Sequence, residues 1–161
     1  MSSERLLHTQ GLNAWYGAAQ ILFDVDLEVH RGEVVALMGR NGAGKSTTLK
    51  ALMGMMPRRS GRIEYLGQDI SNAPPHQVAR QGLGYVPEDR RIFTDLSVAE
   101  NLSVGRQPPR HFPDGSPAPV WSPEQLFRLF PNLAEMQHRF AARMSGGEQQ
   151  MLAMGRALMA R

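Results

Sequence analysis

Residues 39–47 carry the types and spacing from which a phosphate-binding site can be built. Their sequence, Gly-Arg-Asn-Gly-Ala-Gly-Lys-Ser-Thr, fits the P-loop pattern G-x-x-x-x-G-K-[ST]. Gly42 and Gly44 let the backbone turn so that successive N–H groups point into one anion-binding concavity. Lys45 adds a positive charge for the β- and γ-phosphates, and the Ser46 hydroxyl is placed to hold Mg²⁺. The residues expected to contact the nucleotide here are Gly39, Asn41, Gly42, Ala43, Gly44, Lys45, Ser46 and Thr47.

The segments on either side of the P-loop are those that the motif requires. Residues 33–38 form a short apolar run typical of a buried parallel strand. Residues 45–55 have helical spacing, with Leu49, Leu52 and Met53 on one face. A helix that begins beneath phosphates stabilises their negative charge through its dipole. The sequence therefore predicts a nucleoside triphosphate site between a strand and a helix.

A second stretch, residues 144–150, places two glycines at the start of a predicted helix. Ser145 and Glu148 form a capping box. Glycine weakens a helix by up to about 1 kcal/mol per residue relative to alanine. The two glycines also leave backbone N–H groups uncovered at the positive end of the helix, which suits a second anion contact. A capped structural helix explains the same residues equally well. The apolar positions that follow at helical spacing are Met151, Met154, Gly155 and Leu158.

Apolar runs and turn residues predict the remaining elements. The predicted strands cover residues 6–16, 21–29, 62–66 and 83–86. The predicted helices cover residues 75–81 and 95–104 and a short segment that begins at Ser122, where Gln125 completes a capping box. Residues 57–61 and 107–119 are expected to be loops, because glycine and proline punctuate them.

Length and composition exclude several classes of protein. At 161 residues with 42% hydrophobic and 20% charged residues, the chain is one globular domain or a large part of one. No run of about 18 apolar residues predicts a membrane span, and the N-terminus carries no secretion signal. Cysteine is absent, which excludes disulfides and thiolate metal sites. The net charge is only +3, and the pairs Arg58-Arg59 and Arg90-Arg91 predict a solvated surface and no nucleic-acid partner.

Together these motifs resemble the nucleotide-binding subunits of ABC transporters. The resemblance runs from about residue 6 to residue 161, and residues 144–149 resemble the signature motif L-S-G-G-Q, with Met for Leu and Glu for Gln. It implies an α/β fold, a P-loop NTPase core with an antiparallel β-subdomain and a helical subdomain. We expect residues 1–161 to be part of one such domain. The core and β-subdomain would cover about residues 1–87, and the helical subdomain with the signature motif about 88–161.

The resemblance also assigns roles to residues outside the P-loop. Tyr16 lies where the family places an aromatic that stacks on adenine, although core packing is the simpler explanation of such a residue and Trp15 is a neighbouring candidate. Glu88 falls at the Q-loop, where the family usually has Gln, and its carboxylate can approach Mg²⁺ or the attacking water. Lys45 and Glu88 are thus the expected catalytic residues, and Ser46 and Glu88 the expected metal ligands. The nucleotide contacts implied for the signature motif are Ser145, Gly146, Gly147 and Glu148.

The resemblance further implies partners and a location. In this family two ATPase subunits face each other head to tail, and each ATP with its Mg²⁺ lies between the P-loop of one copy and the signature motif of the other. Transmembrane permease subunits and, indirectly, a periplasmic or extracellular solute-binding protein complete the transporter, so the subunit is peripheral on the cytoplasmic face of the inner (plasma) membrane. Residues 90–93 and 146–152 resemble the branched-chain amino acid importer branch.

One expected feature of the family is not found in this sequence. The family has an apolar strand that closes in Asp-Glu, which supports Mg²⁺ and polarises the attacking water, and no Asp or Glu here follows a buried apolar run in that way. We therefore expect a fold that is incomplete at its C-terminus, and a chain that alone is aggregation-prone and nearly inactive as an ATPase. Two alternatives remain open: a non-catalytic ATP-binding or regulatory module, and an ABC ATPase for another solute such as urea or amides. A kinase or GTPase would leave residues 145–149 unexplained.

Overall fold

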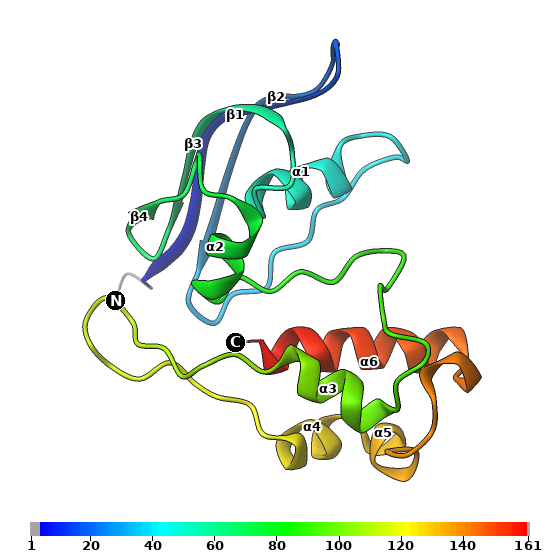
Figure 1. Ribbon diagram of the computed structural model, residues 1–161. Coiled ribbons are helices and arrows are strands. Elements are labelled where there is room, and N and C mark those ends of the chain that lie inside the picture. Colours follow the sequence, from blue (N-terminus) through cyan, green and yellow to red (C-terminus); the bar gives the residue numbers. More distant parts are fainter. Residues whose placement is uncertain (1–3, 161) are drawn as a thin grey trace. The chain divides into compact units, whose positions relative to one another are not determined.

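The computed structural model describes residues 4–160 of the chain (Figure 1). The chain divides into two compact units, Met1–Ala79 and Arg80–Arg161, and each is described here by itself. The first unit carries the P-loop and a β-sheet, and the second is mostly helical.

A four-stranded antiparallel sheet forms the framework of the first unit. Its strands follow the order β2-β1-β3-β4, and β1 pairs with both β2 and β3. The strands are β1 (Arg5–Tyr16), β2 (Ala19–His30), β3 (Arg58–Tyr65) and β4 (Gln68–Asp69). The first two confirm the predicted strands. The loop predicted over residues 57–61 is wrong, because Arg58 and Arg59 pair with Trp15 and Ala14 of β1, and an irregularity in β1 between Gln10 and Asn13 lets β3 continue past its glycine.

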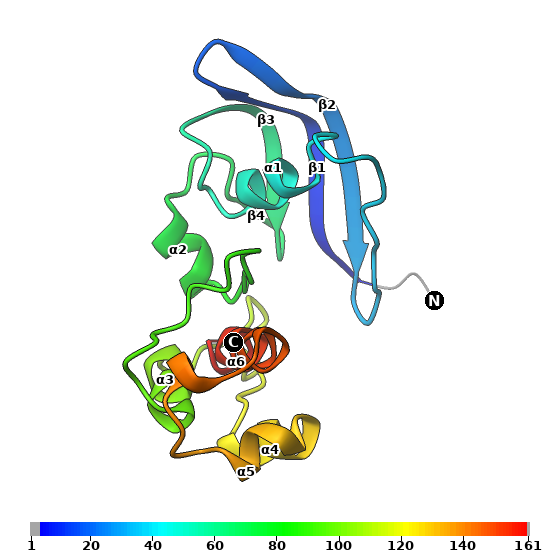
Figure 2. The same ribbon diagram turned by 90° about the vertical axis from the view of Figure 1, so that its right-hand side faces the viewer.

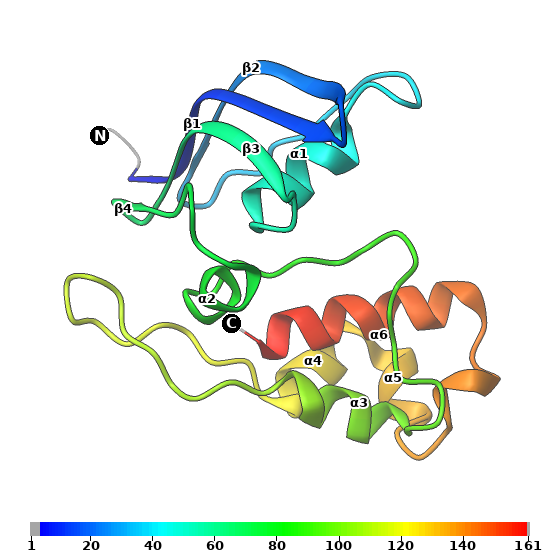
Figure 3. The same cartoon turned by 45° about the horizontal axis from the view of Figure 1, so that its top comes forward.

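Helix α1 (Lys45–Leu52) lies against one face of this sheet (Figures 2 and 3). It buries Thr47, Thr48, Ala51 and Leu52. The prediction that Leu49 shares the buried face is wrong, since Leu49 is exposed. The helix is also shorter than predicted, because Gly54 follows it in a left-handed conformation. The predicted short helix at residue 75 is confirmed as α2 (Pro75–Arg80).

The strand predicted immediately before the P-loop is not formed. Residues 33–38 belong to no helix or strand, and Val34 and Met38 are 94% and 91% exposed. A strand exists only where neighbouring backbone satisfies its N–H and C=O groups. None of the four strands in residues 4–160 pairs with this segment. The apolar composition of a strand is thus present without the ladder that would make it one.

The second unit packs its helices around α6 (Gly146–Met159). The other helices are α3 (Val98–Gly105), α4 (Pro123–Leu129), α5 (Pro131–Glu135) and the 3₁₀ turn η1 (Ala141–Arg143). The helices predicted at residues 95–104 and from Ser122 are confirmed, and the latter has its capping box. The strand predicted over residues 83–86 is wrong, because Gly84 lies close to Ala157 of α6 and the described residues offer this segment no partner strand.

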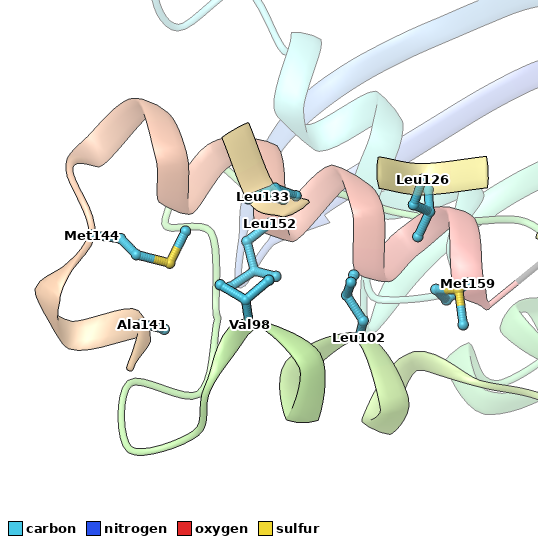
Figure 4. Close-up of a cluster of buried hydrophobic side chains, with 8 residues drawn as sticks. All are labelled: Val98, Leu102, Leu126, Leu133, Ala141, Met144, Leu152 and Met159. Carbon is cyan, nitrogen blue, oxygen red and sulfur yellow. The ribbon is translucent and has the colours of Figure 1, made fainter. Parts of the chain in front are cut away.

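Seven side chains from these helices, together with Met144 between η1 and α6, meet in one apolar cluster (Figure 4). They are Val98, Leu102, Leu126, Leu133, Ala141, Met144, Leu152 and Met159. Full burial of one leucine stabilises a fold by roughly 1.5–3 kcal/mol. The buried face of α6 differs from the predicted one: of the predicted stripe only Gly155 is buried, and Met154 is exposed. Leu102 of α3 packs closely on Gly155, which sets the face that α6 turns inward.

The predicted surface loop over residues 107–119 is confirmed. It contains no helix or strand, only an isolated antiparallel bridge between His111 and Pro117. Arg110 anchors the loop by donating from Nη1 to the carbonyl oxygen of Gln81 over 2.7 Å.

Candidate functional site

The backbone of the P-loop turns sharply before α1 begins. Gly42 and Gly44 have φ angles of 84° and 91°, in the left-handed region that side chains other than glycine rarely adopt. Gly44 is also confined, because a Cβ there would lie 2.8 Å from Leu22 Cδ2. Gly42 has open space around it. The loop therefore depends on glycine for its conformation at both positions and for close packing at Gly44.

The first turn of α1 has free N–H groups and no negative charge, which favours binding of an anion. Gly44 is its N-cap, no side chain caps it, and no acidic residue lies in its first turn. The first N–H groups of a helix have no partner within it. Thr48 N–H, which donates to the Gly44 carbonyl oxygen over 2.8 Å, makes the first bond of the helix. The preceding N–H groups, at the positive end of the helix dipole, can therefore donate to a phosphate.

Lys45 and Ser46 supply the polar side chains at this helix end. Lys45 Nζ donates to the carbonyl oxygens of Gly39 and Arg40, both over 2.8 Å, so the ammonium group lies across the loop. An ammonium has three donors, and two of them are used here. Ser46 is exposed. Thr47 is only 7% exposed and belongs to the buried face of α1, which leaves its hydroxyl less accessible than that of Ser46.

The polar residues of this site fit Mg²⁺ when a nucleotide and water supply most of the metal's ligands. The described residues contain no group of three His, Cys, Asp or Glu side chains that could hold a metal ion by itself. Mg²⁺ on a nucleotide keeps several waters and uses phosphate oxygens with one or two protein ligands. The exposed Ser46 hydroxyl suits that arrangement. Glu88, the other predicted ligand, is exposed and belongs to the second unit.

Tyr16 and Trp15, at the end of β1, differ in their surroundings. Tyr16 is 47% exposed and pairs with Ala19 across the hairpin turn. Trp15 is partly buried, and the Arg58 guanidinium lies 4.8 Å from the centroid of its ring. Of the two aromatics, Tyr16 has the more accessible ring. Its contact with adenine remains a prediction.

The N-terminus of α6 confirms the predicted capping box. Ser145 Oγ accepts a hydrogen bond from Glu148 N–H over 3.3 Å, and Glu148 Oε2 accepts one from Ser145 N–H over 2.7 Å. Gly146 and Gly147 are both exposed, and nothing lies within 4 Å of where a Gly147 Cβ would be. The backbone is therefore open to a ligand at Gly147, while the Arg90 guanidinium lies close to Gly146 and the Glu148 carboxylate is engaged in the cap.

The loop that carries Glu88 is held to α3 by Asn101, a residue that the sequence did not predict to be part of the site. Asn101 of α3, fully buried, accepts from Phe93 N–H and donates to the carbonyl oxygens of Phe93, Leu96 and Ser97. Ser97 and Glu100 form a third capping box, whose S-x-x-E pattern is present in the sequence and could have revealed it. No local pattern marks Asn101, because its partners are set by the tertiary fold.

One member of each arginine pair lies in the predicted solvated surface and the other does not: Arg58 and Arg91 are exposed, whereas Arg59 and Arg90 are partly buried. Arg59 donates to the carbonyl oxygens of Met56, Ser71 and Ala73, and partial burial lowers the pKa of its guanidinium. Arg90 donates from Nη1 to Gln149 Oε1 of α6 over 3.1 Å. Backbone carbonyls and a side-chain amide thus partner these cations, and part of the positive charge is structural.

Among the described residues, no helix is long and apolar enough to cross a membrane.

Comparison with known proteins places the chain in a family. Residues 22–161 match the profile of the ABC transporter family. The chain is 43% identical over 156 residues to the high-affinity branched-chain amino acid transport ATP-binding protein BraG of Pseudomonas aeruginosa. It is 36% identical over 159 residues to the probable branched-chain amino acid transport ATP-binding protein LivF of Archaeoglobus fulgidus. The lipopolysaccharide export system ATP-binding protein LptB of Haemophilus influenzae is 32% identical over 157 residues.

These matches cover most of the chain and a smaller part of each relative. They span 97% of the chain and 65% of BraG, and 95% of the chain and 63% of LivF. The chain therefore spans a little less than two thirds of the length of these relatives.

Solved structures give the same result. An ATP-binding subunit of an ABC transporter, 31% identical, matches 96% of the chain and 62% of its own length with a TM-score of 0.74. A nucleotide-free ATP-binding cassette, 26% identical, matches 97% of the chain and 65% of its own length with a TM-score of 0.73. The α/β fold is that of the ABC ATPase cassettes, and the chain belongs to the ABC transporter family, among its ATP-binding proteins.

Proposed function

We propose that this chain binds ATP with Mg²⁺ and powers the uptake of branched-chain or related amino acids as part of an ABC importer. The observation that carries the nucleotide site is the uncapped start of α1, where a left-handed Gly44 and an exposed Ser46 lie beside the Lys45 ammonium. The solute class rests on relatives described as branched-chain amino acid transport proteins. LptB, which is 32% identical, is described as part of an export system, so the direction of transport has to be tested directly.

In this proposal, the P-loop grips the phosphates through its backbone. The N–H groups around residues 42–47 donate to β- and γ-phosphate oxygens, and Lys45 turns its remaining donor toward the same oxygens. Ser46 would hold Mg²⁺, which neutralises charge on the phosphates. Tyr16 stacks on adenine, and its exposed ring is available for that contact.

The signature motif acts on the nucleotide of a second ATPase subunit. Its open backbone at Gly146 and Gly147, at the start of a 14-residue helix, supplies N–H donors to a γ-phosphate held by the P-loop of the partner. ATP thereby joins the two copies head to tail. Membrane permease subunits would dock this peripheral assembly on the cytoplasmic face of the membrane, and a solute-binding protein would deliver the amino acid to them.

Hydrolysis by these 161 residues alone should be slow. Glu88 is the carboxylate that resemblance places near the attacking water, and no Asp-Glu pair follows a buried apolar run in this sequence. Loss of a general base typically slows a reaction by about 10²- to 10⁴-fold.

The test of nucleotide binding is titration with a fluorescent ATP analogue. Lys45→Ala should raise the Kd at least about 10-fold, because it removes a charge-assisted hydrogen bond. Lys50→Ala, in the same helix, is the matched control and should leave the Kd unchanged. Equal affinity in the wild-type chain and Lys45→Ala would contradict the proposal. Uptake of labelled leucine, against labelled urea, by the assembled transporter then decides the solute class and the direction.

A further inference from the structure

Two consecutive arginines in the Glu88 loop adopt an unusual backbone. Arg90 and Arg91 have φ angles of 62° and 47°, in the left-handed region. Their N–H groups donate to the carbonyl oxygens of Pro87 and Asp89, over 3.1 and 2.7 Å. Left-handed conformations are unfavourable for side chains other than glycine and persist where the surroundings enforce them. Something outside the loop must therefore hold residues 87–93 in this shape.

The first such contact is made by Arg90 with the start of α6. Its Nη1 donates to Gln149 Oε1 over 3.1 Å, and its Nη2 lies 3.3 Å from where a Gly146 Cβ would be. The other end of the Gln149 amide is also engaged, because Nε2 donates to the Ala141 carbonyl oxygen over 3.0 Å. The guanidinium thus lies beside Gly146, the first glycine of the signature motif. A side chain at residue 146 would crowd the guanidinium.

Further contacts fasten the rest of the loop. Arg156, two turns further along α6, donates from Nη2 to the Arg91 carbonyl oxygen, and its guanidinium lies 5.1 Å from the centroid of the Phe93 ring. Arg156 Nη1 is buried without a hydrogen-bond partner. The guanidinium is therefore held by its contact with the Phe93 ring and by the hydrogen bond from Nη2 to the Arg91 carbonyl oxygen. Asn101 of α3 holds Phe93 through both its N–H and its carbonyl oxygen.

We infer that Arg90 is a positioning residue that couples the loop of Glu88 to the first turn of the signature helix. Through the bond between Arg90 and Gln149, a displacement of Glu88 is transmitted to Gly146 and Gly147. The consequence for turnover rests on the proposed function, whereas the mechanical coupling does not. Arg90 acts through Gln149, and its effect is to fix where the loop of Glu88 and the first turn of α6 lie relative to each other.

The coupling can be tested in the chain itself by amide hydrogen exchange. Arg90→Ala should speed exchange about 10-fold or more at both ends of the link, at Phe93 and at Glu148 and Gln149, because it removes a hydrogen bond from a charged group. Gln149→Ala should produce the same pattern from the other side. Arg128→Ala, an exposed arginine on α4, is the control and should change neither segment. The inference is overturned if Arg90→Ala speeds exchange in residues 87–93 alone.

Swapping the two residues distinguishes a specific hydrogen bond between positions 90 and 149 from a general loss of stability. The double variant Arg90→Gln with Gln149→Arg keeps a donor and an acceptor facing each other, and should restore slow exchange in both segments. Arg90→Lys lacks the planar fork and should restore less. If the double variant exchanges as fast as Arg90→Ala, or if Gln149→Ala leaves Phe93 unchanged, the link is not the cause and the inference fails.

A second readout concerns turnover in the assembled transporter. Arg90→Ala should lower kcat for ATP about 10-fold while the KM changes by less than about 2-fold, since the P-loop is untouched. A kcat equal to that of the wild type would overturn the role of Arg90 in turnover. Absence of any ATP hydrolysis by the wild-type transporter would instead count against the proposed function, and the exchange results would stand apart from it.

Discussion

Gly44 combines two demands at one residue of the nucleotide loop. Its φ of 91° is unfavourable for other residues, and a Cβ there would lie only 2.8 Å from Leu22 Cδ2 of β2. Gly42 shares the first demand, with a φ of 84°, but has open space around it. Alanine at residue 42 would therefore be disfavoured by backbone strain alone, and alanine at residue 44 by backbone strain and steric crowding together.

We predict that Gly44→Ala lowers the free energy of unfolding by about 2–4 kcal/mol, the sum of left-handed strain and overpacking. Gly42→Ala should cost about 1–2 kcal/mol, from strain alone. Urea unfolding followed by circular dichroism measures both. Equal losses in the two variants would show that Leu22 moves aside at no cost.

The polar residues of the site were predictable from sequence to different degrees. Lys45 and Ser46 belong to a contiguous motif, and the structure places them at the helix start that the motif predicts. The pairing of Arg90 with Gln149 joins residues 59 positions apart, and only the packing of the loop on α6 brings them together. Pairings of this kind leave no periodic or local signal in a single sequence.

At the level of elements, α3 depends on its N-terminal cap. Hydrogen bonds from the Ser97 hydroxyl, and then from the Ser97 backbone N–H, hold the pKa of the Glu100 carboxyl below its usual range. A carboxyl whose pKa is lowered by folding stabilises the fold above its unfolded pKa. That contribution is lost as the pH falls through the lowered pKa of the folded state.

We therefore predict that the second unit becomes less stable as the pH falls below about 4, and that part of this loss comes from Glu100. Ser97→Ala should lower stability at pH 7 and flatten the dependence on pH in the acid range. Thermal unfolding between pH 3 and pH 7 measures both effects. An unchanged pH profile in Ser97→Ala would assign the acid sensitivity to other carboxyls.

Helix ends were more predictable than strands, for a physical reason. A capping box is satisfied within four residues, so S-x-x-E and S-x-x-Q patterns identified α4 and α6 directly. A strand depends on backbone partners far away in the sequence. Residues 33–38 and 83–86 have strand-like composition, yet no strand of the described chain pairs with either. The inward face of α6 differs from the predicted one for the same reason, because Leu102 of a different helix determines it.

Residues 33–38, just before the P-loop, expose apolar side chains on the surface of the molecule. Val34 and Met38 are almost fully exposed, and the backbone between them belongs to no sheet. Exposed apolar residues together with unpaired backbone favour association with other chains. The structure thus gives a local cause for the aggregation expected of the isolated chain.

We predict that Val34→Ser with Met38→Ser reduces self-association of the isolated chain, measured as the fraction of monomer in sedimentation velocity. Val120→Ser, which changes an exposed valine in the loop before α4, is the control and should have little effect. If the double variant aggregates as readily as the wild type, the surface responsible lies elsewhere.

The central claim is that the P-loop of one copy and the signature motif of another hold the same ATP. Because the sequence has no cysteine, Arg40→Cys and Ala142→Cys each create a single reactive thiol at an exposed position, the first within the P-loop and the second just before the signature motif. Two differently tagged chains, one with each substitution, should be joined by a short bis-maleimide linker when ATP is present and hydrolysis is blocked, and much less with ADP. Linking that is independent of nucleotide, or that joins the two thiols only within one doubly substituted chain, would contradict the account.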